Sequence, residues 1–119
     1  MYLGCTPAIA ALEVLAHNAR PALLEASYVI IEARLPDSAV LDIDRAALPS
    51  GWDDAADARS AAAIGDAWLA SGASLALRVP SAVLPLESNL VVNVRHPRYA
   101  EMQVGEPRPF RFDPRLAGA

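Results

Sequence analysis

A single carboxylate inside an otherwise apolar run constrains this chain more than any other feature of its sequence. Residues 8–16 read AIAALEVLA, and Glu13 is the polar side chain among them. Thr6 and Pro7 stand directly before the run as an N-cap and a first helical residue, so the pattern predicts a helix. A helix that is apolar all round is buried on most sides. Glu13 therefore has no polar face of its own helix to occupy.

The position of Glu13 on this helix leaves two interpretations open. At 100° per residue its side chain lies about 40° from Ile9 and about 60° from Ala16. A carboxylate in such surroundings is either satisfied in the core, by an Arg or by backbone N–H groups, or it is used chemically. Both interpretations predict that the rest of the fold supplies partners for this side chain.

Composition narrows the class of protein. The 119 residues suffice for one domain, residues 1–119, and are too few for two domains of ordinary size. A hydrophobic fraction of 54% with 20% charged residues is typical of a globular protein and argues against disorder. The ten basic residues are all arginine and are scattered, and the net charge is −4. Direct binding to nucleic acid through its phosphates is therefore not expected.

Several other kinds of site and location are disfavoured. One cysteine cannot form an internal disulfide, which fits the cytoplasm. No apolar run approaches the roughly 20 residues that cross a bilayer, and the first residues lack the basic start of a signal peptide. His17, His96 and Cys5 are too few and too far apart for a metal site. A free cysteine is usually a small buried hydrophobe, so a catalytic Cys5 is not favoured. No phosphate-binding loop, dinucleotide fingerprint or nucleophile elbow is present.

The pattern of apolar and turn residues predicts helices and strands in mixed order. Helices are expected from Pro7 to residues 18–20 and over 58–70, the second stopped by Gly72, with short helices at 22–26 and 96–102. Strands are expected at 1–3, 28–35, 40–44, 74–79 and 90–94. Residues 48–57 are expected to form a loop, and the tail from Gly105 is expected to be irregular. Because the order lacks a strict strand–helix–strand rhythm, we predict an α+β fold, a compact mixed sheet with flanking helices.

Three polar residues stand at strand ends or inside apolar surroundings. Tyr2 ends the first expected strand, Ser81 follows a strand that stops at Pro80, and Asn93 interrupts an apolar strand. Strand ends often place reactive groups on a rigid support beside a cleft. Each residue also has a structural interpretation: a core aromatic, a turn former and a loop anchor, respectively.

Five segments of the chain, taken in order, resemble the RES domain. They are YL at residues 2–3 with AALEVLAH at 10–17, GDAWL at 65–69, LRVPSAV at 77–83, NVRHP at 93–97 and PFRFDPRL at 109–116. Each segment is weak by itself, but a chance match of five in the same order is improbable. The resemblance extends over nearly the whole chain.

The resemblance implies a function. The RES family is named for an Arg, a Glu and a Ser, and its members are toxins of bacterial toxin–antitoxin pairs whose antitoxin carries an Xre-like helix-turn-helix. They are similar in fold to ADP-ribosyltransferase toxins. They consume NAD as a substrate, with no resident cofactor, by phosphorolysis, hydrolysis or ADP-ribosyl transfer. By this resemblance Glu13, Ser81 and Tyr2 are the catalytic residues and Asn93 is a substrate-binding residue.

The chemistry of NAD cleavage suits these residue types. In such a site Glu13 would stabilise the positive charge that develops on the ribose, and Tyr2 would stack on the nicotinamide or ribose. Ser81 would hydrogen-bond a phosphate or the ribose, and an Arg would hold the pyrophosphate. The family's Arg belongs to a segment before the strand that ends at Tyr2, and this sequence begins after it. We therefore expect that Arg to be absent, with Arg34 or Arg78 as candidates to replace its charge.

Two functions of different classes follow. The first is an NAD-consuming toxin that keeps Glu13, Tyr2 and Ser81 in one pocket. The second is a catalytically weak or inactive RES-fold binding module that docks an Xre-like antitoxin or pairs with itself. We expect an oligomer formed through the antitoxin.

Overall fold

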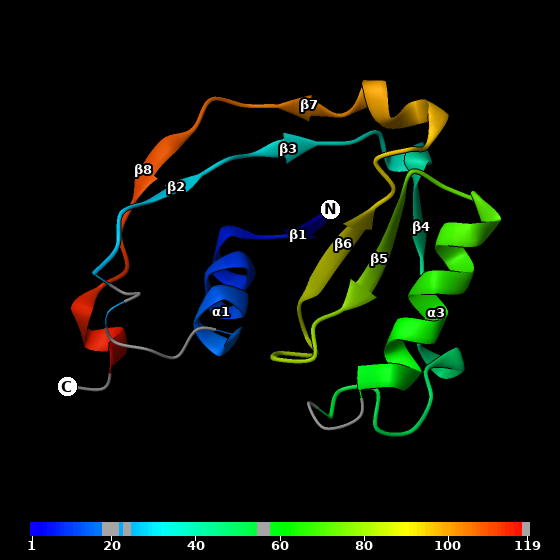
Figure 1. The fold of residues 1–119 in the computed structure, drawn as a ribbon, viewed down its shortest axis with the longest axis horizontal. Helices are drawn as coiled ribbons and strands as arrows, with labels where there is room; N and C mark the ends of the chain where they lie inside the picture. The colour runs from blue at the N-terminus through cyan, green and yellow to red at the C-terminus, as the bar shows by residue number, and fades with distance from the viewer. Residues whose placement is uncertain (18–21, 23–24, 55–57, 118–119) are drawn as a thin grey trace.

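A four-stranded mixed sheet lies at the centre of the computed structural model, which describes residues 1–17, 22, 25–54 and 58–117. The strand order is β1-β6-β5-β4 (Figure 1). β6 is antiparallel to both β1 and β5, whereas β4 is parallel to β5. The four strands are β1 (Tyr2–Gly4), β4 (Val40–Asp42), β5 (Ala76–Pro80) and β6 (Ser88–Val92).

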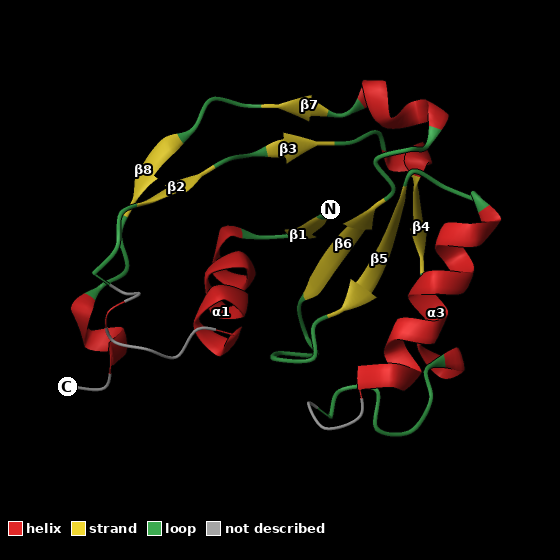
Figure 2. Ribbon diagram, viewed as in Figure 1, coloured by secondary structure: helices red, strands yellow, loops and turns green. Residues whose placement is uncertain are grey.

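Two α-helices flank this sheet, α1 (Pro7–His17) and α3 (Ala58–Ser71). In Figure 2 they stand on either side of the central strands. Together with the mixed sheet they confirm the predicted α+β class. Thr6 caps α1 as predicted, because its Oγ1 accepts the N–H of Ile9 at 3.2 Å. α3 ends where predicted, at Gly72, whose φ of 62° lies in the left-handed region that favours glycine.

The backbone of β1 and that of α1 approach each other unusually closely where the two elements connect. A Cβ atom on Gly4 would lie 2.7 Å from the nitrogen of Ala10 and 2.8 Å from its Cα. Only glycine permits this approach, which draws α1 against the edge of the sheet. The N–H of Cys5 fixes the same corner by donating to the carbonyl of Ser88 at 3.0 Å. Glu13, three residues after Ala10, is thereby brought to the end of the sheet.

A pair of two-stranded ribbons forms a long arm beside the sheet, drawn in cyan and orange in Figure 1. β2 (Tyr28–Ile30) pairs with β8 (Arg108–Phe110), and β3 (Ala33–Arg34) pairs with β7 (Gln103–Val104), both antiparallel. The prediction of one strand over 28–35 is therefore wrong, as is that of a wholly irregular tail. The two segments lie far apart in sequence, and the local pattern of each carries no sign of this pairing.

Short 3-10 helices fill several connections. η3 (Pro97–Glu101) occupies most of the helix predicted at 96–102, and His96 caps it by accepting the N–H of Arg98 at Nδ1, 3.0 Å away. The others are η1 (Asp37–Ala39), η2 (Arg45–Ala47) and η4 (Pro114–Ala117). The predicted end of the first helix at 18–20, and most of the predicted turn at 22–26, fall outside the described residues.

A cluster of buried hydrophobic residues lies where η1 and η3 meet the sheet. It consists of Ala39, Leu75, Ala76 and Val92, with Leu3, Leu35, Val40, Tyr99 and Met102 packed against it. α1 contributes less than its sequence predicts: only Ile9 of this helix is fully buried. The prediction of a helix buried on most sides is thus wrong in extent, because α1 packs mainly along β1. None of the described helices is long and apolar enough to span a membrane.

Candidate active site

Glu13 is held by two uncharged donors from neighbouring strands, both far from it in the sequence. Ser81, directly after β5, donates its hydroxyl proton to Glu13 Oε1 at 2.7 Å. Asn89, in β6, donates from Nδ2 to the same oxygen at 2.8 Å. The side chain of Glu13 is 14% exposed. Its two partners at Oε1 are a hydroxyl and an amide, neither the Arg nor the backbone N–H groups that the structural interpretation proposed.

Every hydrogen-bonding position of the Ser81 hydroxyl is occupied. Its Oγ accepts the N–H groups of Val83 at 3.1 Å and Leu84 at 3.2 Å, and its single proton goes to Glu13. A hydroxyl offers one donor and two acceptor positions, and the residue has no exposed surface. Ser81 therefore acts as a positioning residue for Glu13 in this geometry. Direct contact of Ser81 with a phosphate or ribose stays a prediction.

Asn89 is the member of the site that sequence reasoning missed. It is fully buried, and the second hydrogen of its Nδ2 reaches the hydroxyl oxygen of Tyr2 at 3.1 Å. The predicted strand began at Leu90, two residues later than β6, which left Asn89 in a loop. Beginning the strand at Ser88 places Asn89 on the same sheet face as Val91, because alternate residues of a strand share a face. That alternation was the available signal.

Tyr2 connects the carboxylate to a pocket, which Tyr2 lines and Glu13 and Ser81 do not. Its side chain is largely exposed there, and its hydroxyl oxygen accepts from Asn89. Partial burial raises the pKa of Tyr2, and the charge of Glu13 adds to this effect, whereas the hydrogen bond from Asn89 opposes it. The hydroxyl is therefore protonated near neutral pH, with its own hydrogen free to point away from Asn89. We refer to Glu13, Ser81, Asn89 and Tyr2 as the Glu13 cluster.

His17 lies one helical turn after Glu13. Its Nδ1 donates to the backbone carbonyl of Glu13 at 2.7 Å and lies 3.7 Å from Oε2, the carboxylate oxygen away from Ser81. The imidazole is exposed. No group of three or more His, Cys, Asp or Glu side chains comes together among the residues that the structure describes.

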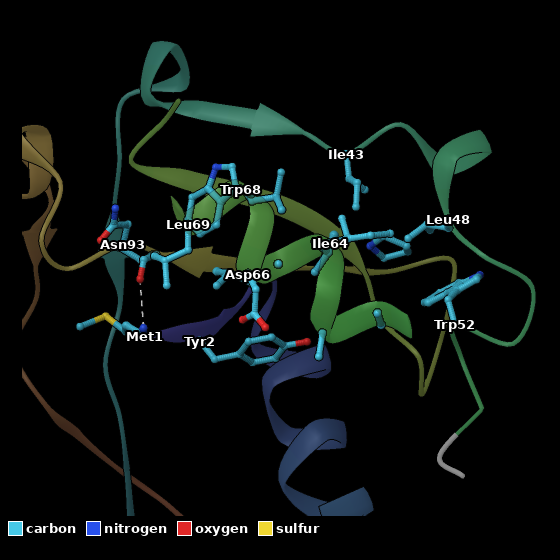
Figure 3. Close-up of a pocket in the computed structure, with 18 of the residues that line it drawn as sticks. Met1, Tyr2, Ile43, Leu48, Trp52, Ile64, Asp66, Trp68, Leu69 and Asn93 are labelled. Carbon is cyan, nitrogen blue, oxygen red and sulfur yellow. Dashed lines mark hydrogen bonds between the residues drawn. The ribbon is translucent and has the colours of Figure 1, made fainter. Parts of the chain in front are cut away.

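The pocket has a volume of about 770 Å³ and is lined by both α3 and the central strands (Figure 3). Small-molecule and cofactor sites typically measure ~300–1,000 Å³ and are mostly apolar. The lining is of this kind, with Tyr2 on one side and large apolar side chains on the others: Ile43, Leu48, Trp52, Ile64, Trp68 and Leu69. Figure 3 shows the carboxylate of Asp66 directed toward the ring of Tyr2.

The arginines expected to replace the family's Arg lie elsewhere. Arg34 pairs with Glu32 at 2.7 Å on the ribbon arm. Arg78 pairs with Asp42 at 2.9 Å, which raises the pKa of Arg78. The strand pleat directs Arg78 away from the face that carries Leu77. Neither arginine lines the pocket, whereas Arg95 does.

Asn93 also lines the pocket but stands apart from the Glu13 cluster. Its backbone N–H donates to the carbonyl of Leu75 at 2.8 Å, and its Oδ1 accepts the N–H of Arg95 at 3.0 Å. The oxygen thus stabilises the turn, and the amide nitrogen is the part of the side chain that remains for binding a substrate. Substrate binding by Asn93 stays a prediction, as do the catalytic roles of Glu13 and Tyr2.

Comparison with known proteins points to one family. A model of the RES domain matches residues 1–113. A protein named Toxin Res from Yersinia enterocolitica is 32% identical over 117 residues, covering 98% of this chain and 76% of that protein. A Prs ADP-ribosylating toxin from a Sphingobium species is 30% identical over 119 residues, covering 98% of this chain and 73% of that protein. A Toxin Res from Photorhabdus laumondii is 30% identical over 93 residues, covering 78% of this chain and 59% of that protein.

Proposed function

The chain belongs to the RES domain family, and from that premise we propose that it is a toxin that consumes NAD by breaking the nicotinamide–ribose bond. The observation that carries the proposal is the pair of hydrogen bonds that Ser81 and Asn89 donate to Glu13, beside a pocket of cofactor size. Relatives named as toxins support the toxic role, and the one named for ADP-ribosylation supports NAD as the substrate.

The reaction requires a negative charge near the ribose. When the bond between ribose C1′ and the nicotinamide nitrogen breaks, both electrons go to the nitrogen, and neutral nicotinamide leaves without a general acid. The ribose takes on oxocarbenium character until the oxygen of an acceptor bonds to C1′ and the acceptor's proton passes to solvent. A carboxylate close to C1′ stabilises that cation, and preorganised groups of this kind contribute roughly 10²–10³-fold in rate.

The donors around Glu13 suit this task. An arginine partner would hold the carboxylate firmly but would offset its charge. A hydroxyl and an amide hold Oε1 and leave the net negative charge in place. Oε2 is the oxygen on the other side of the same carboxylate, near His17. Because the side chain is largely shielded from water, its attraction for a developing cation is weakened less by solvent.

The pocket provides surfaces for the rest of the dinucleotide. Trp52 and Trp68 offer large apolar faces for aromatic rings. Arg95 is the positively charged side chain among the described lining residues, and a guanidinium matches the geometry of phosphate oxygens. In our proposal the pyrophosphate lies toward Arg95, and the ribose that is cleaved lies against Tyr2, with its C1′ on the side of Glu13.

The direct test is the release of nicotinamide. The purified chain is incubated with NAD in three mixtures: buffer alone, buffer with phosphate, and buffer with protein extract. Products are separated by chromatography, so that free ADP-ribose, its phosphate ester and modified protein report hydrolysis, phosphorolysis and transfer. We expect nicotinamide release in at least one mixture, and its loss in Glu13→Gln, which keeps the size of the side chain but removes its charge. Absence of release from all three mixtures at high protein concentration contradicts the proposal.

A docking function is favoured by a second observation. The loop between β5 and β6, which begins at Ser81, exposes Leu86 by 92%, together with Val83 and Leu84. Clustered exposed apolar side chains often mark a protein interface. We propose that an Xre-like antitoxin covers this loop and so restrains the toxin. Co-purification with the Xre-like partner should survive Glu13→Gln and weaken in Leu86→Ser, and equal recovery of both variants contradicts this docking site.

A further inference from the structure

We infer that Asn89 is a positioning residue whose amide nitrogen fixes the separation between Glu13 and Tyr2. One nitrogen donates to Glu13 Oε1 at 2.8 Å and to the hydroxyl oxygen of Tyr2 at 3.1 Å. The residue is fully buried within β6, where it pairs with Val79 of β5 and Gly4 of β1. The consequence for turnover rests on the proposed function, whereas the geometric statement can be tested without it.

The orientation of the Asn89 amide follows from the chemistry of its partners. With the amide reversed, Oδ1 would face the carboxylate of Glu13, and two acceptors would meet without a hydrogen between them. Only Nδ2 can donate to Glu13, so this orientation is the one that the cluster permits. Each of the two amide hydrogens then has a separate acceptor, on a separate element: α1 for Glu13 and β1 for Tyr2.

The other end of the amide shows that Asn89 is not simply a satisfied core residue. Its Oδ1 is buried without a hydrogen-bond partner among the described residues. A buried acceptor that lacks a donor opposes folding. An apolar side chain at this position, between β1 and β5, would avoid that cost. The nitrogen is therefore the part of the side chain that explains an asparagine here.

Two effects on the site follow. Ser81 and Asn89 both donate to Glu13 Oε1, so Oε2 is the carboxylate oxygen that neither of them binds. Accepting from Asn89 leaves the hydroxyl hydrogen of Tyr2 to point toward the pocket that its ring lines. If the two groups drift apart by about 1 Å, the expected cost in rate is about 10²-fold.

The first test follows the ionisation of Tyr2, which requires no turnover. The ultraviolet absorbance of the phenolate is titrated in the wild-type chain and in Tyr2→Phe, and the difference isolates Tyr2 from Tyr28 and Tyr99. Because the hydrogen bond from Asn89 lowers the pKa of Tyr2, its removal in Asn89→Leu should move this titration to higher pH. Asn89→Asp, which has nearly the same shape, should move it further, because it adds a negative charge.

A matched control removes a buried hydrogen bond elsewhere. Ser74 accepts from Trp68 Nε1 at 2.8 Å and donates to the carbonyl of Ala76 at 2.7 Å, away from the Glu13 cluster. Ser74→Ala should lower the unfolding temperature and leave the Tyr2 titration unchanged. Circular dichroism over the same pH range establishes that each variant is folded during the titration. If Asn89→Leu does not fold, Asn89→Asp decides the result.

The second test compares NAD turnover in the same variants. We expect kcat to fall by about 10²-fold in Asn89→Asp, with a change in KM of less than about 3-fold, because the groups are displaced rather than removed. A Tyr2 titration unchanged in both Asn89 variants overturns the inference, whatever the turnover. A wild-type chain that does not cleave NAD, together with a shifted Tyr2 titration, overturns the proposed function and supports the inference.

Discussion

Polar groups meet at almost the same distance in two very different parts of this molecule. Ser81 Oγ lies 2.7 Å from Glu13 Oε1, and Arg115 Nη2 lies 2.8 Å from Asp113 Oδ2. Ser81 has no exposed surface, whereas the side chain of Arg115 is 90% exposed. Exposed ion pairs contribute little to stability, because water and salt already satisfy both partners. The energetic weight of a contact here depends on its burial, not on its length.

The two regions also differ in what happens to the charge. At the surface several carboxylates meet a guanidinium, as in Arg34–Glu32, Arg98–Glu101 and Arg115–Asp113. In the Glu13 cluster the donors to the carboxylate are a hydroxyl and an amide, which carry no charge to offset it. In a surface pair the guanidinium offsets the charge of the carboxylate. A carboxylate that is shielded from water and bonded only by uncharged donors can attract a cation. This difference is the physical basis on which we propose that the chemistry takes place at Glu13.

The largest predicted effect removes the charge from the Glu13 cluster. Glu13→Gln should reduce NAD cleavage by about 10²–10³-fold, since the amide cannot stabilise the ribose cation. Nicotinamide release under saturating NAD measures the change. Glu32→Gln, which removes a carboxylate from a surface pair, serves as the control and should leave release unchanged. Similar losses in the two variants would show that buried and exposed carboxylates do not differ as we argue.

The approach of α1 to the sheet gives the second prediction. Gly4→Ala should destabilise the fold by about 1–3 kcal/mol, because the new methyl group meets the backbone of Ala10, which cannot move aside cheaply. Gly65→Ala in α3 is the matched control, since no atom lies within 4 Å of a Cβ there. Alanine is the better helix former, so this control should stabilise by about 0.5–1 kcal/mol. Urea denaturation of both variants tests the opposite signs.

Sequence reasoning reached the parts of this structure that depend on local pattern. The cap at Thr6, the glycine stop at Gly72 and the isolation of Glu13 all follow from neighbouring residues. It did not reach the ribbon arm, because the pairing of β2 with β8 joins segments about 80 residues apart that have no shared local signal. Long-range pairing of this kind is decided by the whole chain rather than by strand propensity.

The site was predicted in part, for the same reason. Glu13, Ser81 and Tyr2 were identified together from the family resemblance, and the structure places them within one hydrogen-bonded group. Asn89 was missed because the predicted start of β6 lies two residues too late. The position of a strand boundary decides whether a polar residue is assigned to a loop or to a sheet face that meets the site. The replacement arginine was also misplaced, since charge pairing of Arg34 and Arg78 depends on tertiary neighbours.

Truncating the buried hydroxyl gives the third prediction. Ser81→Ala removes the donor to Glu13 and leaves the N–H groups of Val83 and Leu84 without their acceptor. We expect a loss of about 1–3 kcal/mol in the free energy of unfolding, as is usual for buried groups left unsatisfied. Ser38→Ala, which loses a hydroxyl that accepts from the exposed Arg98, is the surface counterpart. A stability loss no larger than that of Ser38→Ala would remove burial as the distinguishing factor.

The fourth prediction concerns alkaline pH. The pKa of Tyr2 is raised in the folded chain, so the folded state retains this proton at a pH where the unfolded state has lost it. The contribution to stability is therefore present below pH about 10, the ordinary value for tyrosine, and is lost as the pH rises through the folded value. The wild-type unfolding free energy should fall more steeply above pH about 10 than that of Tyr2→Phe. Parallel curves for the two proteins would contradict the effect of partial burial on the pKa of Tyr2.

The smallest effect is expected at the most exposed pair. The hydrogen bond from Arg115 lowers the pKa of Asp113, so the pair stabilises the fold above the ordinary carboxyl value and loses that effect as the pH falls through the lowered one. Because the Arg115 side chain is almost fully in water, Arg115→Ala should shift a urea unfolding curve at neutral pH by no more than the scatter between replicates. The same variant measured at low and high salt should show no difference that the wild-type chain lacks. A loss comparable to that of Ser81→Ala would mean that the short N–O distance, rather than shielding from water, sets the strength of polar contacts in this fold. Burial would then no longer distinguish the Glu13 cluster from the exposed ion pairs.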